Sequence, residues 1–456
     1  MAKEKKKRKR KKHLIGKKEF LFNFFSLVFM IGIGLYFGGR SLYYYSKQNV
    51  KIKEEEMTLN GWIKTNNPIV KNEEEGLHQD KEGYYFKGNV QNNYVKFRNQ
   101  LFRVIRVNSD ETVKIIGEEY AASFMWGDES TYEDSNIRNW LVKTEKESSG
   151  VYLDTIPNFS KFLTKTSYTL DTLKDDGVEE GKDSYDDMAS ILGIKDYIKA
   201  NGKNSYLNNG KLFFLLGYDE ENQNLYVDED GSVRPCDSLE GYGIRPVLTI
   251  SKNMLVSSGD GTKDNPYVIE QGEDTNAIGK FMKLGDDIYI IFYDKDNVLR
   301  MHRYGYLPTN GGNLKLPYSN TNSIFDMKTR GTLAYYLNRD YLFSLNYGKM
   351  LLDFSYPVGE ISDDAGYAME NIYQKQVTAK IGLMNIFDFH VVNASETYYH
   401  MNLTSEVGSM EYVVHGNGLL EEVDVREALP VVPVIAVEKS RITGGNGSAE
   451  EPYVME

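Results

Sequence analysis

A phrase that closes the chain also occurs near its middle, and this repetition limits what the chain can fold into. The segment GDGTKDNPYVIE ends at Glu270, and the similar segment GNGSAEEPYVME ends at Glu456, 186 residues later. Short Gly-rich turns match by chance, but a shared Gly-x-Gly-[Ser/Thr]-x-x-x-Pro-Tyr-Val-x-Glu pattern indicates an internal repeat. An internal repeat fixes the architecture of a chain, and it should place further landmarks at the same spacing.

Other landmarks recur in the same order. Leu101 and Ile288 occupy matching positions in two strand–turn–strand segments 187 residues apart, and the remaining landmarks are offset by 186 to 196 residues. Units of this length far exceed solenoid repeats, which run to about 50 residues, and they match the usual size of a domain. The sequence therefore predicts two tandem copies of one domain, residues 81–270 and residues 271–456.

Each predicted copy begins with a three-strand meander rich in Val, Ile, Tyr and Phe and broken by Asn, Asp and Gly turns. Apolar residues at i, i+3 and i+4 then predict a helix, with Ile137, Trp140 and Leu141 on one face of it in the first copy. A later segment, 379–389 in the second copy, is expected to be a short strand that runs into a short helix. The expected class is α+β with mostly antiparallel strands.

The N-terminal region combines a basic segment with an apolar one. Residues 1–19 carry eleven Lys/Arg and two Glu, and residues 20–38 contain no charge. Nineteen uncharged, mostly apolar residues span about 28 Å as a helix, close to the thickness of a bilayer. We expect a single membrane anchor from Phe20 to Gly38, with the basic head in the cytoplasm and the rest of the chain outside.

Two alternatives to the anchor are a cleaved signal peptide and a buried core helix. A signal peptide has a shorter apolar core and a small-residue cleavage site, and eleven flanking cations disfavour a buried helix. Residues 39–80, rich in Lys, Glu and Asn, are expected to form an extracellular stalk. Because the basic head has a net charge of +9 and the whole chain −12, the remainder carries −21, which argues against nucleic acid as a partner.

Three segments carry a resemblance to a known family: NNYVKFRNQLFRVIRVNSDETVKII, the stretch ASILGIKDY, and GIRPVLTISKNMLVSSGDGTKDNPYVI. They resemble an uncharacterised domain that occurs, often in tandem, on membrane-anchored or secreted proteins of Gram-positive bacteria. The final Arg-Pro-Val strand also resembles that of C-type-lectin-like folds. The resemblance implies two lectin-like domains without an established activity, and the second copy departs from it where Val432 replaces Arg245.

No residue pattern in the sequence indicates catalysis, a metal or a cofactor. The histidines do not form a His-x-x-x-His pair, and the Asp-rich turns lack the third ligand and the terminal glutamate of a calcium loop. Catalytic elbows and phosphate loops are absent from the sequence as well. We therefore expect a protein that is not an enzyme and that needs no cofactor.

A binding surface is expected on the loops around the last strands of each copy. Aromatic and charged residues there are the candidates for ligand contacts: Trp126, Tyr218, Asp219, Arg234, Tyr242 and Arg245 in the first copy, and Tyr412 and His415 in the second. For Arg245 a structural ion pair that supports the closing hairpin is the favoured alternative interpretation. Trp140 is expected to lie in the core, because it shares a helical face with apolar residues.

These features favour a membrane-anchored bacterial surface protein that displays two non-catalytic lectin-like domains for ligand binding or adhesion. The expected partner is a cell-wall glycan or a surface protein, and two copies on one stalk would raise avidity. A structural or regulatory component of an envelope assembly is the first alternative, and a divergent envelope enzyme is the second.

Overall fold

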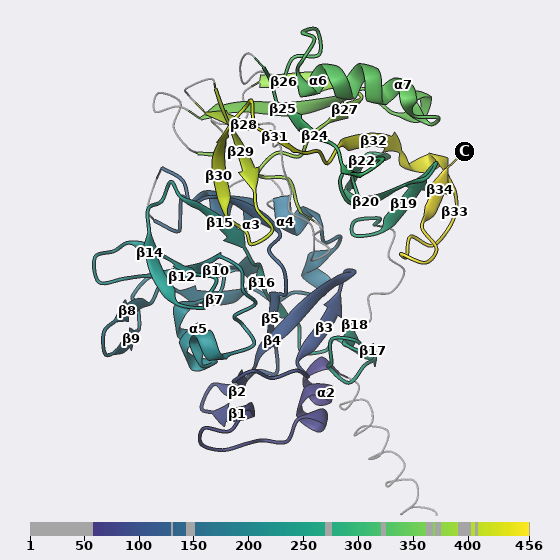
Figure 1. Cartoon of the computed structure of the whole chain (residues 1–456). Helices are drawn as coiled ribbons and strands as arrows, with labels where there is room; N and C mark the ends of the chain where they lie inside the picture. Colours follow the sequence, from purple (N-terminus) through teal and green to yellow (C-terminus); the bar gives the residue numbers. More distant parts are fainter. Residues whose placement is uncertain are drawn as a thin grey trace, which may run out of the picture.

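The structure of the chain is a computed structural model. It describes residues 58–128, 131–142, 151–269, 276–320, 325–361, 368–369, 375–390, 403–405 and 409–455. We call residues 58–269 the first half and residues 276–455 the second half. Figure 1 shows the second half stacked on the first, with the C-terminal strands at the outer edge of the second half.

The basic head and the apolar segment 20–38 lie outside the described residues. Among the residues that are described, no helix is both long and apolar enough to cross a membrane. The anchor from Phe20 to Gly38 therefore stays a prediction.

The first half is built on a sheet whose seven main strands come from distant parts of that half. They are β3 (Tyr94–Phe97), β4 (Gln100–Asn108), β5 (Val113–Gly117), β11 (Ala189–Ser190), β16 (Val247–Ile250), β17 (Val256–Ser258) and β18 (Tyr267–Ile269). Their spatial order is β11-β16-β5-β4-β3-β18-β17. A hairpin of β1 (Gly76–Asp80) and β2 (Gly83–Lys87) extends this sheet by pairing with β4.

The second half repeats these seven main strands one for one. Its members are β19 (Phe281–Leu284), β20 (Asp287–Lys295), β21 (Val298–Arg303), β27 (Ile381–Gly382), β32 (Val434–Glu438), β33 (Ile442–Gly444) and β34 (Tyr453–Met455). Their order, β27-β32-β21-β20-β19-β34-β33, matches that of the first half position by position. The shared sequence landmarks thus correspond to a shared strand order.

The repeated closing phrase has the same structural role in both halves. Its last strand, β18 or β34, lies parallel to the first strand of the meander, β3 or β19. Its first glycine has a positive φ, 109° at Gly259 and 81° at Gly445. A Cβ there would lie 2.0 Å from the carbonyl oxygen of Pro266 or Pro452. Only glycine fits this turn, which explains why both copies of the phrase have glycine at this position.

A third, twelve-stranded sheet runs through both halves. Its strands are β6 (Ala122–Met125), β8 (Thr172–Lys174), β9 (Gly177–Glu179), β12 (Phe213–Tyr218), β13 (Asn224–Val227), β14 (Val233–Cys236), β15 (Gly241–Ile244), β25 (Phe354–Ile361), β26 (Lys375–Ala379), β28 (Leu403–Ser405), β29 (Met410–Val414) and β30 (Leu420–Asp424). The halves join where β15 pairs with β30, with Gly241 opposite Leu420. This shared sheet connects the two halves directly.

Small pairs of strands and short helices complete the fold. The pairs are β7 (Thr166–Thr169) with β10 (Ser184–Asp187), β22 (Pro308–Thr309) with β23 (Gly312–Asn313), and β24 (Lys315–Pro317) with β31 (Ala428–Pro430). The α-helices are α2 (Leu59–Asn66), α3 (Asn136–Leu141), α4 (Val151–Asp154), α5 (Ile194–Lys199), α6 (Leu333–Tyr335) and α7 (Leu342–Ser344), with a π-helical stretch, η3 (Tyr336–Tyr341), between the last two. Single 3-10 turns, η1 (Phe159–Lys161), η2 (Gly202–Asn204), η4 (Gly348–Met350) and η5 (Lys439–Arg441), lie in the connections.

The predicted α+β class is wrong, and so is the C-type-lectin-like architecture built on it. Strands make up 42% of the structure and helices 14%, and the strands form several sheets. The predicted helices exist as brief turns, such as the six residues of α3, because their apolar stripes cover only one or two turns. The polar stretch 166–187, which has no apolar periodicity, forms four short strands instead.

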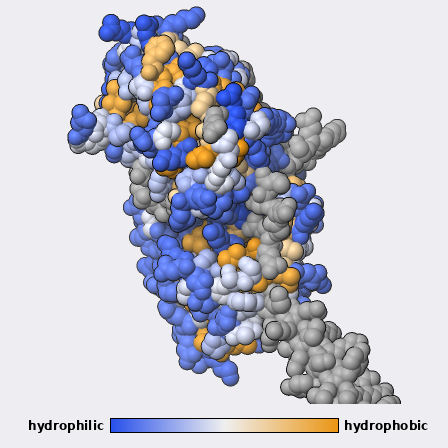
Figure 2. Space-filling view, turned by 90° about the vertical axis from the view of Figure 1, so that its right-hand side faces the viewer, coloured by the Kyte–Doolittle hydropathy of each residue, from blue (hydrophilic) through white to orange (hydrophobic). Residues whose placement is uncertain are grey.

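An ion pair occurs at the same place in both halves, half-buried in the first and buried in the second. Lys114 on β5 contacts Asp196 on α5 at 3.0 Å, and Arg300 on β21 contacts Asp388 at 3.4 Å. In each half the ion pair links the third strand of the meander to the segment that follows β11 or β27. The surface outside this framework is mostly hydrophilic, with small separate apolar areas on both halves (Figure 2).

Candidate functional site

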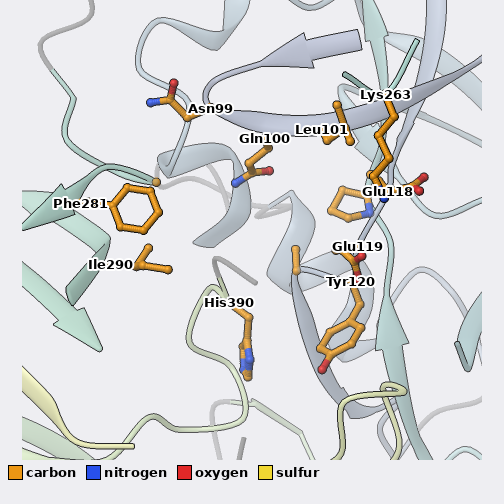
Figure 3. A pocket seen from close by; sticks show the side chains of 14 residues that line it. Asn99, Gln100, Leu101, Glu118, Glu119, Tyr120, Lys263, Phe281, Ile290 and His390 are labelled. Carbon is orange, nitrogen blue, oxygen red and sulfur yellow. The ribbon is translucent and has the colours of Figure 1, made fainter. Parts of the chain in front are cut away.

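A cleft of about 220 Å³ lies at the junction of the two halves and is the candidate functional site. Figure 3 shows Phe281 and Ile290 of the second half facing Gln100 of the first half across this space. The lining comprises Asn99, Gln100, Leu101, Gly117, Glu118, Glu119, Tyr120, Ala121, Pro246, Lys263, Gly279, Phe281, Ile290 and His390. Ligand sites often form at domain interfaces, where two surfaces supply one apolar wall and a few polar groups.

Local structure explains why the first half presents these groups. Arg98 and Asn99 have positive φ in the tight turn between β3 and β4, so the chain reverses there and exposes Asn99 and Gln100 at the mouth. The chain leaves β5 at Gly117 and carries Glu118 and Glu119 along the floor. The cleft thus takes its polar rim from turns and its floor from the end of a strand.

The two carboxylates of the cleft are already balanced by cations of the first half. Arg103 lies 3.7 Å from Glu118, and the Tyr94 hydroxyl donates a hydrogen bond to Glu118 at 3.4 Å. Lys211 forms an ion pair with Glu119. A charged ligand would therefore meet a nearly neutral floor, and polar, uncharged ligands suit it better.

His390 closes the cleft from the second half. Its backbone N–H donates to the carbonyl oxygen of Ala121 at 2.7 Å, and its ring centroid lies 6.3 Å from that of Tyr120. Burial lowers the pKa of His390 to about 3, and the neighbouring His302 adds to this effect. The imidazole is therefore neutral at physiological pH and adds no charge to the cleft.

Replacing His390 with glutamine is expected to make stability less sensitive to acid. Because the folded pKa of about 3 lies below the ordinary value of 6.5, the unfolded chain binds a proton in this range that the folded chain does not. The stability from the neutral ring is complete above pH 6.5 and is lost as the pH falls toward the folded pKa. Lowering the pH from about 7 to about 5 should reduce the free energy of unfolding of the natural chain by about 2 kcal/mol more than that of His390→Gln. Urea unfolding of both proteins at both pH values measures this difference. An equal loss in both proteins would contradict this prediction.

Three of the sequence-predicted ligand residues are buried in the first half. Trp126, Tyr242 and Arg245 are exposed by 0%, 6% and 1% respectively. The Arg245 guanidinium donates hydrogen bonds to the carbonyl oxygens of Gly117 and Leu207 at 2.9 and 2.6 Å. Arg245 thus stabilises the first half through backbone contacts instead of the expected ion pair.

The other first-half candidates lie at turns and edges of the shared sheet. The Asp219 carboxylate accepts backbone hydrogen bonds from Glu221 and Gln223, which fixes the turn between β12 and β13 next to the half-buried Tyr218. Arg234 is exposed on β14 and pairs with Asp228 at 2.6 Å. These residues do not line the cleft.

The second-half candidates belong to the hairpin of β29 and β30. Tyr412 is half-buried on β29, and the His415 ring lies 2.5 Å from the Glu421 carboxylate across the hairpin. The carbonyl oxygen of His415 accepts a hydrogen bond from the Tyr120 hydroxyl of the first half at 3.0 Å. The hairpin tip therefore contacts the first half near the cleft, and the eight predicted residues do not form one site.

The comparisons with known proteins give no relative for this chain. No family model matches it, and neither a curated protein nor a solved structure does so. Within the described ranges, no three His, Cys, Asp or Glu side chains are close enough together to hold a metal ion.

Proposed function

We propose that this chain is a non-catalytic binding protein that is held at the outer face of a cell membrane and takes its ligand in the cleft between the two halves. The observation that carries the proposal is the composition of the cleft. Its walls come from both halves, it combines an apolar side with amide and hydroxyl groups, and its two carboxylates have internal partners. Such a site suits reversible recognition of a polar, uncharged group, as on a cell-wall glycan or a surface protein.

The membrane location rests on the sequence of the N-terminal region. A basic head followed by nineteen uncharged residues favours an anchor with its N-terminus inside the cell. The chain after Gly38 would then be outside, where cell-wall material is within reach. Protease added to intact cells should degrade the chain beyond the anchor, and full protection would contradict this orientation.

Replacing Phe281 with alanine is expected to weaken binding of the full chain to purified cell-wall sacculi at least about tenfold, which corresponds to about 1.4 kcal/mol. Phe281 supplies the half-buried ring on the second-half wall of the cleft. Gln100→Ala, on the opposite wall, should also weaken binding, because the ligand is expected to touch both halves. A sedimentation assay with sacculi, followed by a glycan array, measures both effects.

The matched control is Phe343→Ala, which removes the same ring from a position on α7 that is 80% exposed and outside the cleft. This variant should bind as the natural chain does. If Phe281→Ala and Gln100→Ala both bind as tightly as the natural chain does, the proposal is contradicted. If sacculi and glycans are not bound at all while crosslinking on cells captures one protein at the cleft, the partner is a protein.

A further inference from the structure

An open groove of about 260 Å³ lies on the second half, between β24 and the helical segment formed by α6 and η3. Leu316 and Pro317 belong to its apolar wall, and the half-buried Tyr335 and Tyr336 form an aromatic wall. Figure 1 shows α6 on the side of the second half that faces away from the first half. The groove shares no lining residue with the cleft, so it is a separate candidate site.

The internal repeat gives this groove a counterpart in the first half. β24 and β31 pair antiparallel, as β6 and β15 do. The first N–H of α6 donates to the carbonyl oxygen of Tyr318 at 2.9 Å, and the first N–H of α3 donates to that of Trp126 at 2.8 Å. Tyr318 is therefore equivalent to Trp126, and two residues further on Asn320 is equivalent to Asp128.

In the first half, this counterpart receives a piece of the second half. The backbone N–H of Ala368 donates to the Asp128 carboxylate at 3.1 Å. The backbone N–H of Met369 donates to the side-chain oxygen of Asn136, the first residue of α3, at 2.8 Å. The Met369 side chain is half-buried and packs against the core. The repeated framework thus already binds a peptide segment at this place in one of its two copies.

The groove of the second half keeps an open acceptor at the matching place. The Asn320 amide group donates to the carbonyl oxygen of Gly331 at 3.1 Å, which fixes the orientation of the side chain. Over the ranges that the structure describes, the Oδ1 atom of Asn320 accepts no hydrogen bond. Because Asp128 accepts the Ala368 N–H at the equivalent position, Asn320 can accept the N–H of a peptide that lies in the groove.

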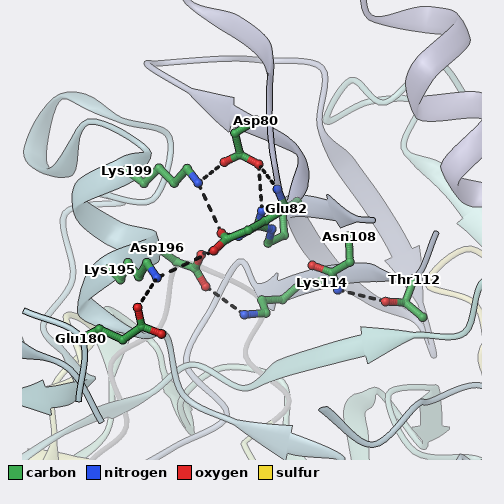
Figure 4. A network of polar contacts seen from close by, with 10 residues as sticks. Asp80, Glu82, Asn108, Thr112, Lys114, Glu180, Lys195, Asp196 and Lys199 are labelled. Atoms are coloured by element: carbon green, nitrogen blue, oxygen red, sulfur yellow. Dashed lines mark hydrogen bonds and ion pairs between the residues drawn. The ribbon is translucent and has the colours of Figure 1, made fainter. Parts of the chain in front are cut away.

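The charged side chains of the groove also lack partners. In the first half, charges are joined in a network of ion pairs that includes Lys114 and Asp196, 3.0 Å apart (Figure 4). Among the described residues, by contrast, Arg330 and Asp340 of the groove form no ion pair. A cation and an anion on one groove complement a ligand that carries an acidic and a basic group.

The helical segment is specialised where it lines the groove. Tyr336 and Asp340 are four residues apart on the π-helical stretch η3, so both side chains reach the groove. The guanidinium of Arg339 lies over the Tyr335 ring, 5.4 Å from its centroid, which leaves Tyr336 as the main aromatic contact for a ligand. The counterpart α3 is an ordinary α-helix. Since π-helical turns are rare and frequent at functional sites, this difference supports a function of the second-half groove.

We propose that this groove binds a short peptide segment of a partner protein. The peptide would donate a backbone N–H to the Oδ1 atom of Asn320, as Ala368 does to Asp128. An apolar side chain of about the size of methionine would then pack against Tyr336. The site is distinct from the cleft, so it would add a protein partner to whatever the cleft binds.

The direction of the bound segment in the first half predicts the charges of the peptide. Ala368 bonds to the loop residue Asp128, and the next residue, Met369, bonds to the start of the helix. A peptide with this direction has its earlier residues near Arg330, beside the loop, and its later residues near Asp340, further along the helix. We therefore expect an acidic residue before the apolar side chain and a basic residue after it.

The test is calorimetric titration of the full chain with the blocked octapeptide Asp-Ala-Gly-Tyr-Ala-Met-Lys-Asn. This is the sequence of residues 364–371 with lysine in place of Glu370, so that a basic residue follows the methionine. We expect saturable binding with a Kd of about 100 μM or lower, and binding at least about tenfold weaker when aspartate replaces the methionine. No saturable binding at about 1 mM peptide would overturn the proposal.

Two variants locate the site. Tyr336→Ala should weaken binding of the octapeptide at least about tenfold, because it removes the aromatic wall. The matched control is Tyr84→Ala, which removes a half-buried ring from β2 of the first half and should bind the octapeptide normally. Asp340→Lys alters an exposed side chain and should reverse the preference, so that the natural glutamate sequence binds more tightly than the lysine peptide. A folded Asp340→Lys protein that still prefers the lysine peptide would overturn the proposal, even if Tyr336→Ala fails to fold.

Sedimentation velocity separates a partner peptide from a second copy of this chain. We expect Tyr336→Ala to leave the oligomeric state of the full chain unchanged. If the natural chain is a dimer that Tyr336→Ala dissociates, another copy of the chain fills the groove and the proposal is overturned.

Discussion

The Arg245→Ala variant is expected to lose about 3–5 kcal/mol of stability, and not merely a ligand contact. The side chain is 1% exposed, and its guanidinium satisfies the buried carbonyl oxygens of Gly117 and Leu207. It also lies over the ring of Phe213, 4.6 Å from the ring centroid. Removing it leaves two buried acceptors without these donors and creates a void beside an aromatic ring.

Thermal unfolding measures this effect, and the melting temperature should fall by roughly 10 °C. The matched control is Arg234→Ala, because the Arg234 side chain is 53% exposed and has one surface ion pair. Its loss should change stability by no more than about 0.5 kcal/mol. A well-folded Arg245→Ala protein with an unchanged melting temperature would contradict the structural role of Arg245.

The sequence predicts the repeated strand framework well, because the features that specify it are local. Both closing phrases contain a glycine whose positive φ a side chain would hinder, and both end in a strand that pairs within its own half. Sequence landmarks that are separated by a nearly constant offset therefore lie on equivalent strands of the two halves. The class was mispredicted because short apolar stripes such as that of α3 suggest more helix than one or two turns provide.

The candidate site could not be predicted in the same way, because it depends on contacts between distant parts of the chain. The partners of Arg245 are 128 and 38 residues away, so its burial has no local signal. The walls of the cleft come from the β3–β4 turn of one half and from β19 and β20 of the other. A repeat in the sequence predicts two domains, but it gives no information on how the two domains pack against each other.

The second large effect is expected at the hairpin that joins the halves. Gly418 has a φ of 94°, and a Cβ there would lie 2.6 Å from the carbonyl oxygen of Leu212. At this tip the Leu212 N–H donates to the Asn417 carbonyl oxygen at 2.7 Å, and the Ser123 hydroxyl donates to that of Gly418. Gly418→Val should displace the tip and weaken the junction by about 2–4 kcal/mol.

Scanning calorimetry of Gly418→Val should show that the two halves no longer unfold together, because each keeps its own sheet while the contact between β15 and β30 is lost. Limited proteolysis should cut the hairpin of the variant before that of the natural chain. Gly311→Val is the control, since a Cβ at Gly311 meets no atom within 4 Å. If Gly418→Val unfolds in one transition at the natural temperature, the hairpin tip does not couple the halves. A displaced tip should also impair the cleft, because its walls come from both halves, so ligand binding and cooperative unfolding should be lost together.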